Sequence, residues 1–235
     1  MKNFIKSTAR KLGYDIRRLE TVTPSSRSSG FTLFKYHKPD GSFDYDAYRR
    51  IQEEGNKRKI DQVWVIEANI KLLSEYLAAH LNPLQFGICH GTRRGNEQLW
   101  FRKYLGCEVI GTEISETAKD FPHTVQWDFH ESNPEWTGKT DFIYSNSFDH
   151  SYAPESCLDT WMNTLRSGGL CILEHTNLHA PEGANELDPF GAELEIMPFL
   201  ITKWAKGKYF IREIIEATEK PSAVRSINFI VIERR

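Results

Sequence analysis

Beyond residue 84 the chain alternates short apolar runs with segments in which apolar residues recur every three or four positions. The runs are typical of buried strands and the periodic segments of amphipathic helices. This alternation predicts an α/β fold with a doubly wound, mostly parallel sheet and helices on both faces. The expected strands are 84–89, 108–112, 124–127, 141–145, 170–174 and 227–232, and the expected helices are 97–105, 154–165 and 210–217. The last strand is expected to join the sheet as an antiparallel member.

The part of the chain before residue 84 is expected to be mainly helical. Helical spacing predicts two helices, at 44–56 and 61–80, that form an N-terminal extension over 44–80. A short extended piece at 31–36 and a turn at 39–41 are expected before them. The segment 21–30 is rich in Ser, Pro and Gly and is predicted to be a linker. The expected organisation is therefore a basic helix and linker over 1–30, followed by one domain over 31–235.

The first 19 residues place apolar side chains near one helical face, with Lys and Arg opposite. Such a basic amphipathic helix could make a peripheral contact with an anionic membrane surface or dock on a protein partner. The plainer interpretation is an ordinary helix packed on its own domain. The sequence leaves both interpretations open.

Composition narrows the class of protein. With 40% hydrophobic residues in 235, the chain can bury one sizeable core. A formal net charge of −2 gives no bulk attraction to nucleic acid, so we expect no nucleic-acid partner. The four cysteines lack zinc-knuckle spacing, and no apolar run is long enough to cross a bilayer. A cytoplasmic location is expected, and the oligomeric state is left open.

Three successive strand ends carry residues suited to a nucleoside. Gly91 and Gly95 bracket the first strand–helix turn, where the backbone must approach a ligand closely. Glu113 ends the second strand, where an acidic side chain can accept both ribose hydroxyls. Trp127-Asp128-Phe129 ends the third and could hold an adenine ring. Each element alone is ambiguous, but the three in register favour a nucleoside cofactor at the carboxyl edge of the sheet.

The glycine spacing separates two kinds of nucleoside cofactor. A dinucleotide site favours GxGxxG, whereas this loop reads Gly-Thr-Arg-Arg-Gly, and no Walker-type Gly-Lys-Ser/Thr is present. The longer step between glycines suits the amino-acid end of S-adenosylmethionine better than a pyrophosphate. Arg93 could meet the carboxylate of that cofactor, or it could be a solvated surface charge.

Residues 84–176 resemble a class I, Rossmann-like methyltransferase domain. The likeness is carried by the loop 90–97, Glu113, the strand end 126–129, the segment 141–150 and the turn 165–170. It implies that the chain binds S-adenosylmethionine. The residues expected to contact this cofactor are His90, Gly91, Thr92, Arg93, Gly95, Glu113, Ile114, Trp127, Asp128, Phe129, Ser145 and Asn146. One departure is Cys89, which stands where an acidic residue often precedes the first motif glycine.

Methyl transfer from a sulfonium requires an aligned acceptor and, for a hydroxyl, removal of its proton. The expected catalytic residues are His150 with its neighbour Asp149, which follow the fourth strand, and His175 after the fifth. The long segment 176–200 is predicted to be an acceptor-binding loop. The His and acid content here could also bind a divalent metal, but no tight ligand spacing supports that, so no metal site is predicted.

The predicted function is S-adenosylmethionine-dependent O-methylation of a sugar or a related small molecule. The sugar rests on a short likeness of the basic start to methyltransferases of bacterial surface-glycan pathways. Two alternatives remain: an N- or C-methyltransferase of a metabolite, and a non-catalytic nucleoside-binding or interaction module with the same fold. Nucleic-acid methylation is disfavoured, because 145–148 reads Ser-Asn-Ser-Phe and lacks an Asn/Asp-Pro-Pro-aromatic motif.

Overall fold

The structure is a computed structural model that describes residues 26–28 and 30–235. The basic helix predicted over 1–19 lies outside the described residues. The linker predicted at 21–30 needs a correction, because Ser26–Ser28 forms strand β1 and pairs with β2 (Phe31–Leu33). Gly30 makes this tight connection, with a φ of 101° that side chains rarely adopt. Strand β2 also pairs with β8 (Phe190–Ala192), which completes a small sheet.

The main sheet has seven strands, in the order β5-β4-β3-β6-β7-β10-β9. Its strands are β3 (Phe86–His90), β4 (Glu108–Glu113), β5 (Thr124–Gln126), β6 (Thr140–Ser145), β7 (Leu165–Thr176), β9 (Tyr209–Glu216) and β10 (Ile227–Arg234). The five strands from β5 to β7 run parallel, and β10 and β9 run antiparallel. The predicted doubly wound, mostly parallel sheet is therefore confirmed, including the antiparallel last strand.

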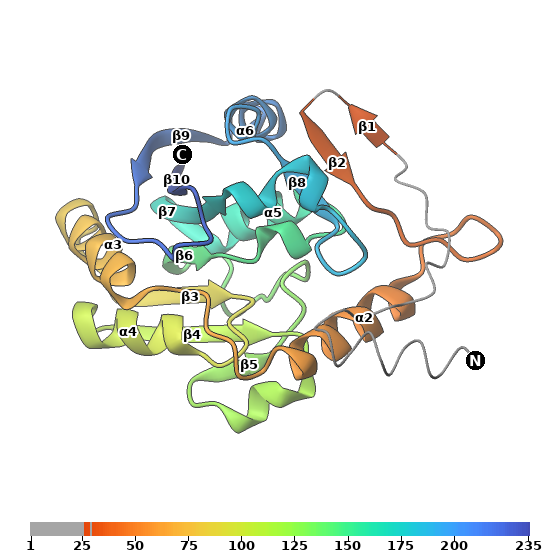
Figure 1. Ribbon diagram of the computed structural model, residues 1–235. Coiled ribbons are helices and arrows are strands. Elements are labelled where there is room, and N and C mark those ends of the chain that lie inside the picture. Colours follow the sequence, from red (N-terminus) through yellow and green to blue (C-terminus); the bar gives the residue numbers. More distant parts are fainter. Residues whose placement is uncertain (1–25, 29) are drawn as a thin grey trace.

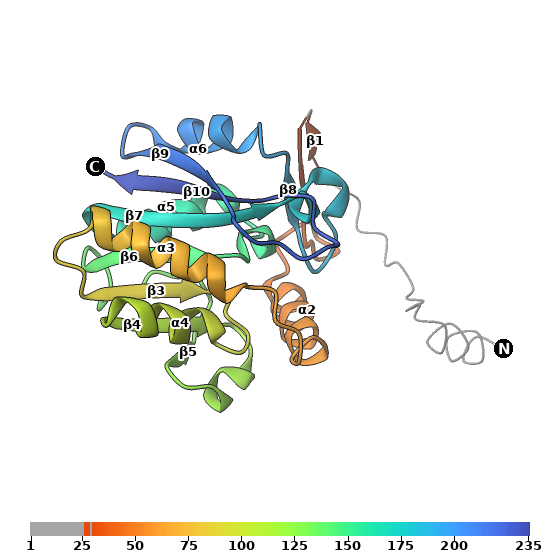
Figure 2. The same cartoon turned by 60° about the vertical axis from the view of Figure 1, so that its left-hand side comes forward.

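Helices cover both faces of this sheet (Figures 1 and 2). One face carries α3 (Glu67–His80) and α4 (Asn96–Leu105), and the other carries α5 (Pro154–Thr164) and α6 (Met197–Ala205). Helix α2 (Tyr45–Arg58) lies across the end of the sheet at which the parallel strands finish (Figure 2). Short 3₁₀ helices lie at η1 (Glu116–Asp120), η2 (Phe148–His150), η3 (Asn177–His179) and η4 (Pro181–Gly183). Among the described residues, no helix is long and apolar enough to cross a membrane.

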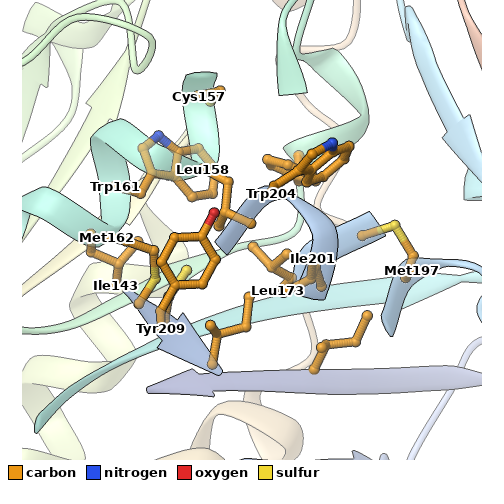
Figure 3. Close-up of a cluster of buried hydrophobic side chains, with 14 of the residues drawn as sticks. Ile143, Cys157, Leu158, Trp161, Met162, Leu173, Met197, Ile201, Trp204 and Tyr209 are labelled. Atoms are coloured by element: carbon orange, nitrogen blue, oxygen red, sulfur yellow. The ribbon is translucent and has the colours of Figure 1, made fainter. Parts of the chain in front are cut away.

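Alternation along the central strands sends neighbouring side chains into two separate cores. Ile143 faces α5 and α6, whereas Phe142 and Tyr144 face α3 and α4. Because both faces are covered, these strands are apolar on both sides. Figure 3 shows the α5–α6 core, in which Trp161 and Leu158 of α5 and Trp204 and Ile201 of α6 pack over the sheet.

Trp161 connects this core to the edge of the sheet. Its side chain is fully buried, and its Nε1 donates a hydrogen bond of 2.8 Å to the carbonyl of Phe129. Trp161→Phe is expected to lower the free energy of unfolding by about 2–3 kcal/mol, because it leaves both a void and an unsatisfied buried carbonyl. Urea unfolding measures this loss, and Phe199→Leu, at a side chain that is 65% exposed, is the control. A loss below about 1 kcal/mol would contradict the assigned packing.

Three secondary-structure predictions were wrong. The segment 210–217 is strand β9, not a helix, because its β-branched residues pair with the edge of β10, which a helix would leave open. The turn expected at 167–169 lies within β7, where the ladder to β6 shifts register. The helix expected to start at residue 61 starts at Glu67. Helix α6 was not anticipated, because its first residues fall in the expected acceptor loop.

Candidate functional site

The candidate site lies at the carboxyl edge of the parallel strands. The chain leaves β3 to build β4 and β5 on one side and returns to build β6 and β7 on the other, which places a crevice beside β3. Two cavities of ≈ 210 Å³ and ≈ 50 Å³ occupy this crevice. Residues that line both are Lys59, Gly91, Arg93, Ser147 and His150, so the two cavities adjoin.

The loop between β3 and α4 is the floor shared by both cavities. Its backbone has positive φ at Gly91 (73°), Arg93 (42°) and Gly95 (76°). Positive φ is rare and strained for an arginine, and such strain concentrates at ligand-binding turns. The amides of Gly91 and Thr92 donate to the carbonyl of Thr112, which fixes the loop against β4. These hydrogen bonds therefore fix the conformation of the loop backbone where it lines the cavities.

Glu113 stands at the end of β4 and lines the smaller cavity. Its Oε1 accepts a hydrogen bond from the amide of Ser115, and its Oε2 accepts one from the amide of Arg93, both at 3.1 Å. Burial raises the pKa of this carboxyl group. Two fixed backbone donors hold the carboxylate, and each oxygen keeps a lone pair for a hydroxyl group.

Asn56 of α2 lies in the same cavity as Glu113. Its Oδ1 accepts a hydrogen bond from Thr117, but its buried Nδ2 has no hydrogen-bond partner. A buried donor without a partner is costly in a folded protein, so it points to a polar ligand group at this place.

The loop after β5 supplies Asp128 and Phe129 to the smaller cavity, and Ile114, which follows β4, lines the same cavity. The Tyr45 hydroxyl donates to Asp128 Oδ2 at 2.8 Å, and the His130 amide donates to Oδ1. Burial acts to raise the pKa of Asp128, but the hydrogen bonds from His130 and Tyr45 hold it below its usual value. A charged acceptor and an aromatic ring therefore lie side by side.

Several residues predicted to contact a cofactor do not line either cavity. Trp127 donates its Nε1 to the carbonyl of Glu131 and packs on Trp136 instead. His90 is buried, with its Nδ1 2.8 Å from Thr112 Oγ1 and its ring stacked on Trp161. Burial lowers the pKa of His90 to about 3, so its ring is neutral at physiological pH.

Ser145 and Gly95 also have structural roles. Ser145 is fully buried, and its hydroxyl donates to the carbonyl of His90. Gly95 is the N-cap of α4. Strand alternation turns His90 and Ser145 inward, so neither side chain lines a cavity, and their contact with a cofactor stays a prediction. Asn146, one residue beyond Ser145, does line the larger cavity, as do Thr92 and Arg93.

Two buried carboxyl groups, Glu97 of α4 and Glu174 of β7, line the larger cavity. Burial raises the pKa of Glu97 to about 8 and that of Glu174 to about 7. The Tyr144 hydroxyl donates to Glu174 Oε2 at 2.6 Å. Cys89, in contrast, is fully buried in the α3–α4 core. Acidic groups are therefore present at the cavity, although not at the position of Cys89.

Four side chains form what we call the Asp–His cluster: Asp149, His150, His179 and Asp188. His150 Nε2 lies 3.4 Å from Asp188 Oδ1, and His179 Nε2 lies 3.7 Å from Asp149 Oδ2. The carboxylate that faces His150 is therefore Asp188, not its sequence neighbour Asp149. Burial raises the pKa of Asp149 to about 6 and lowers that of His179 to about 4.

The structure does not bring His175 to either of these cavities. Its Nε2 lies 2.9 Å from the carbonyl of Ala192, and its ring lines a small void that shares Asp149, Glu174 and His179 with the larger cavity. Burial lowers its pKa to about 4. The expectation that His175 serves as a catalytic base is not supported by this placement.

The segment 176–200 reaches the site at several points, through Leu178, His179, Leu187 and Asp188. It also contains β8 and the start of α6, so only its first part is irregular. Further lining residues come from 59–65 and from Pro221, Val224 and Ile227. Lys59 and Trp64 belong to the N-terminal extension that the sequence predicted, whereas no sequence signal identified Pro221, Val224 or Ile227.

No protein-family profile matches the sequence, and no curated protein matches it. Solved structures do match the fold. A 1,6-didemethyltoxoflavin-N1-methyltransferase from Burkholderia thailandensis, with bound 1,6-didemethyltoxoflavin and S-adenosylhomocysteine, aligns with a TM-score of 0.63 at 15% identity. The alignment covers 90% of this chain and 98% of that one.

Magnesium protoporphyrin IX methyltransferase from Synechocystis PCC 6803, with bound S-adenosylmethionine, aligns with a TM-score of 0.56 at 13% identity over 82% of this chain and 99% of that one. A geranyl diphosphate C-methyltransferase from Streptomyces coelicolor aligns with a TM-score of 0.52 at 14% identity, over 70% and 77%. The fold is therefore that of the class I methyltransferases. These three do not include a glycan-modifying enzyme, so the glycan acceptor stays a prediction.

Proposed function

We propose that this protein is an S-adenosylmethionine-dependent methyltransferase that acts on an oxygen of a small-molecule acceptor. The observation that carries the proposal is the smaller cavity, where Glu113 and the unpartnered Nδ2 of Asn56 lie together. A carboxylate and an amide donor at this point suit the two hydroxyls of a ribose. The shared fold supports the same assignment.

The linings of the two adjoining cavities suit different parts of the cofactor. The smaller one offers Glu113 to the ribose and Asp128 with Phe129 to the adenine. The larger one would receive the methionine tail, next to the loop at Arg93, and the acceptor beyond it. Arg93 Nη1 donates to the carbonyl of Gln62 at 3.0 Å, which orients a cation for the methionine carboxylate.

The methionine ammonium requires a carboxylate that Cys89 does not supply. Glu97 and Glu174 are buried and line the larger cavity, and the charge of Glu174 adds to the burial that raises the pKa of Glu97. An ammonium group placed beside them would offset the cost of ionising them by direct Coulomb attraction. In this proposal they take over the contact that the family pattern would give to an acid at position 89.

Glu97→Gln is expected to remove a pH dependence of stability. Because the folded-state pKa of about 8 lies above the unfolded value, the wild-type protein loses stability as pH rises from about 4.5 through 8. Relative to wild type, the variant should therefore gain about 5 °C or more in Tm between pH 5 and pH 9. Glu54→Gln, at an exposed site on α2, is the control. If the Tm difference between the variant and the wild-type protein stayed the same from pH 5 to pH 9, the raised pKa of Glu97 would be contradicted.

The Asp–His cluster lines the larger cavity, with His150 where the two cavities adjoin, and is suited to act on the acceptor. Transfer needs the acceptor oxygen aligned with the methyl group, and the sulfonium is already a good leaving group. The cluster offers an imidazole and carboxylates that can bind a hydroxyl group and assist the loss of its proton. A hydroxyl group of the acceptor, as in a sugar, suits this cluster, and the apolar residues Val63, Trp64 and Leu178 also line the cavity.

The test uses methyl-labelled S-adenosylmethionine and a panel of nucleotide sugars, sugars, phenols and amines. Transfer to a hydroxyl acceptor is expected. Transfer only to amines or to carbon would favour the alternative metabolite methyltransferases. Tight binding of S-adenosylhomocysteine without transfer to any acceptor would favour the non-catalytic module.

A further inference from the structure

Three residues of the Asp–His cluster come from two different segments and converge at the larger cavity. Asp149 and His150 belong to η2, directly after β6, and Asp188 belongs to the segment 176–200. One ligand atom from each lies within 4.8 Å of the others. One imidazole and two carboxylates are a common set of protein ligands for divalent cations.

The hydrogen bonds of His150 fix its protonation pattern. Gln52 Nε2 donates to the carbonyl of Leu187 at 2.8 Å, which turns Gln52 Oε1 toward His150 Nδ1, also at 2.8 Å. An amide oxygen only accepts, so Nδ1 carries a proton, and Nε2 is the ring nitrogen left to bind a cation. This Nε2 faces the Oδ1 oxygen of Asp188 at 3.4 Å.

Two acceptors that face one another repel unless positive charge lies between them. A charge-assisted hydrogen bond would have a length of about 2.7–2.9 Å, shorter than the observed separation. Ligands at about 2.1 Å from one cation lie about 3.0 Å apart in octahedral and about 3.4 Å apart in tetrahedral geometry. The separation of His150 Nε2 and Asp188 Oδ1 therefore fits two ligands of one cation better than a hydrogen bond.

Asp149 provides a second, independent observation. Its Oδ1 is buried and has no hydrogen-bond partner. Lys59 lines the same cavity, but among the described contacts it makes no ion pair with the cluster. A buried carboxylate oxygen without a donor is costly, and a cation at the cluster would satisfy it.

His179 lies next to the other carboxylate oxygen of Asp149, Oδ2. The amide of Thr176 donates to His179 Nδ1 at 3.3 Å, so the neutral ring carries its proton on Nε2 and points it toward Asp149 Oδ2. The separation of 3.7 Å is longer than a hydrogen bond, so His179 acts on Asp149 as a nearby N–H dipole, and outer groups of this kind help to orient ligating carboxylates. His179 is thus a positioning residue, and Asp149 Oδ1 is left free for the cation.

We propose that Asp149, His150 and Asp188 bind one divalent cation, such as Mn²⁺ or Zn²⁺, whose open coordination positions face the larger cavity. This site would bind the cation whether or not the proposed function is correct. Its role in transfer rests on that function: the acceptor oxygen coordinates the cation, loses its proton to solvent, and attacks the methyl carbon. The oxygen–carbon bond forms as the sulfur–carbon bond breaks, and the sulfonium becomes the neutral thioether of S-adenosylhomocysteine.

The test is a titration of the full chain, stripped with a chelator, with Mn²⁺ followed by the loss of the free-ion electron paramagnetic resonance signal. One bound ion per chain is expected. Asp188→Asn and His150→Gln should weaken binding by about 100-fold, and His179→Ala by about 10-fold. Glu182→Gln, at an exposed acid of the same segment, is the matched control and should leave binding unchanged.

Absence of Mn²⁺ binding by the folded wild-type protein, or equal binding by Asp188→Asn, would overturn the proposal. Calorimetry with S-adenosylhomocysteine on the same metal-free samples separates the two claims. If this nucleoside binds and Mn²⁺ does not, the metal site is wrong and the proposed function stands. If Mn²⁺ binds and the nucleoside does not, the metal site stands and the proposed function is wrong.

Discussion

Replacing Glu113 by alanine is expected to weaken the binding of S-adenosylhomocysteine by about 100-fold or more. Two hydrogen bonds from ribose hydroxyls to a buried carboxylate are worth about 1.5–3 kcal/mol each. The substitution also leaves the amides of Arg93 and Ser115 without their acceptor, so the loop between β3 and α4 loses its fixed position. Calorimetric titration of the folded variant measures the loss.

The matched control lies on the same strand. Glu108 begins β4 at the opposite edge of the sheet, and its side chain is exposed. Glu108→Ala should bind the nucleoside as the wild-type protein does. Affinity of Glu113→Ala within about threefold of wild type, with the fold intact by circular dichroism, would show that the ribose is held elsewhere.

The second large effect concerns turnover. His150→Ala is expected to lower kcat for the acceptor found in the panel by about 100-fold or more. The substitution removes the nitrogen lone pair that faces Asp188, so the acceptor oxygen loses the group that activates it. His150 also lines the smaller cavity, but its polar contacts there are with α2: its carbonyl accepts from the Tyr48 hydroxyl, and its Nδ1 contacts Gln52 Oε1. The affinity for S-adenosylhomocysteine should therefore change by less than about threefold.

His175 provides the comparison, because it was the other histidine that the sequence favoured. Its Nε2 lies close to the carbonyl of Ala192, and its ring lines a small void rather than either of the two site cavities. His175→Asn should keep kcat within about threefold once samples are compared at equal folded fraction. A loss of turnover with His175→Asn that matched the loss with His150→Ala would contradict the assignment of the acceptor side.

The sequence predicted the sheet well because its central strands are buried on both faces. Ile88-Cys89 and Phe142-Ile143 supply both cores from adjacent positions, and such unbroken apolar runs have few other interpretations. Strand β9 was missed for the opposite reason. It is a half-exposed edge strand, and the spacing of Phe210, Ile214 and Ala217 matches a helix as well as a strand.

Some residues of the candidate site could likewise be located from the sequence, and others could not. Glu113 and Gly91 lie where the sequence placed them, at a strand end and in the glycine turn, because the pattern of elements locates both; their contact with a cofactor stays a prediction. Trp127 and His90 could not be judged, because one turns outward to Glu131 and the other inward to Thr112. Asp188 joins His150 only through the path of 176–200 over the cavity. No local sequence signal encodes that pairing.

The central claim is that the crevice beside β3 binds the nucleoside of S-adenosylmethionine. A calorimetric titration of the wild-type protein with S-adenosylhomocysteine tests it most directly. We predict saturable binding at one site per chain, abolished by Glu113→Ala and retained by Glu108→Ala. Absence of binding by folded wild-type protein would contradict the account.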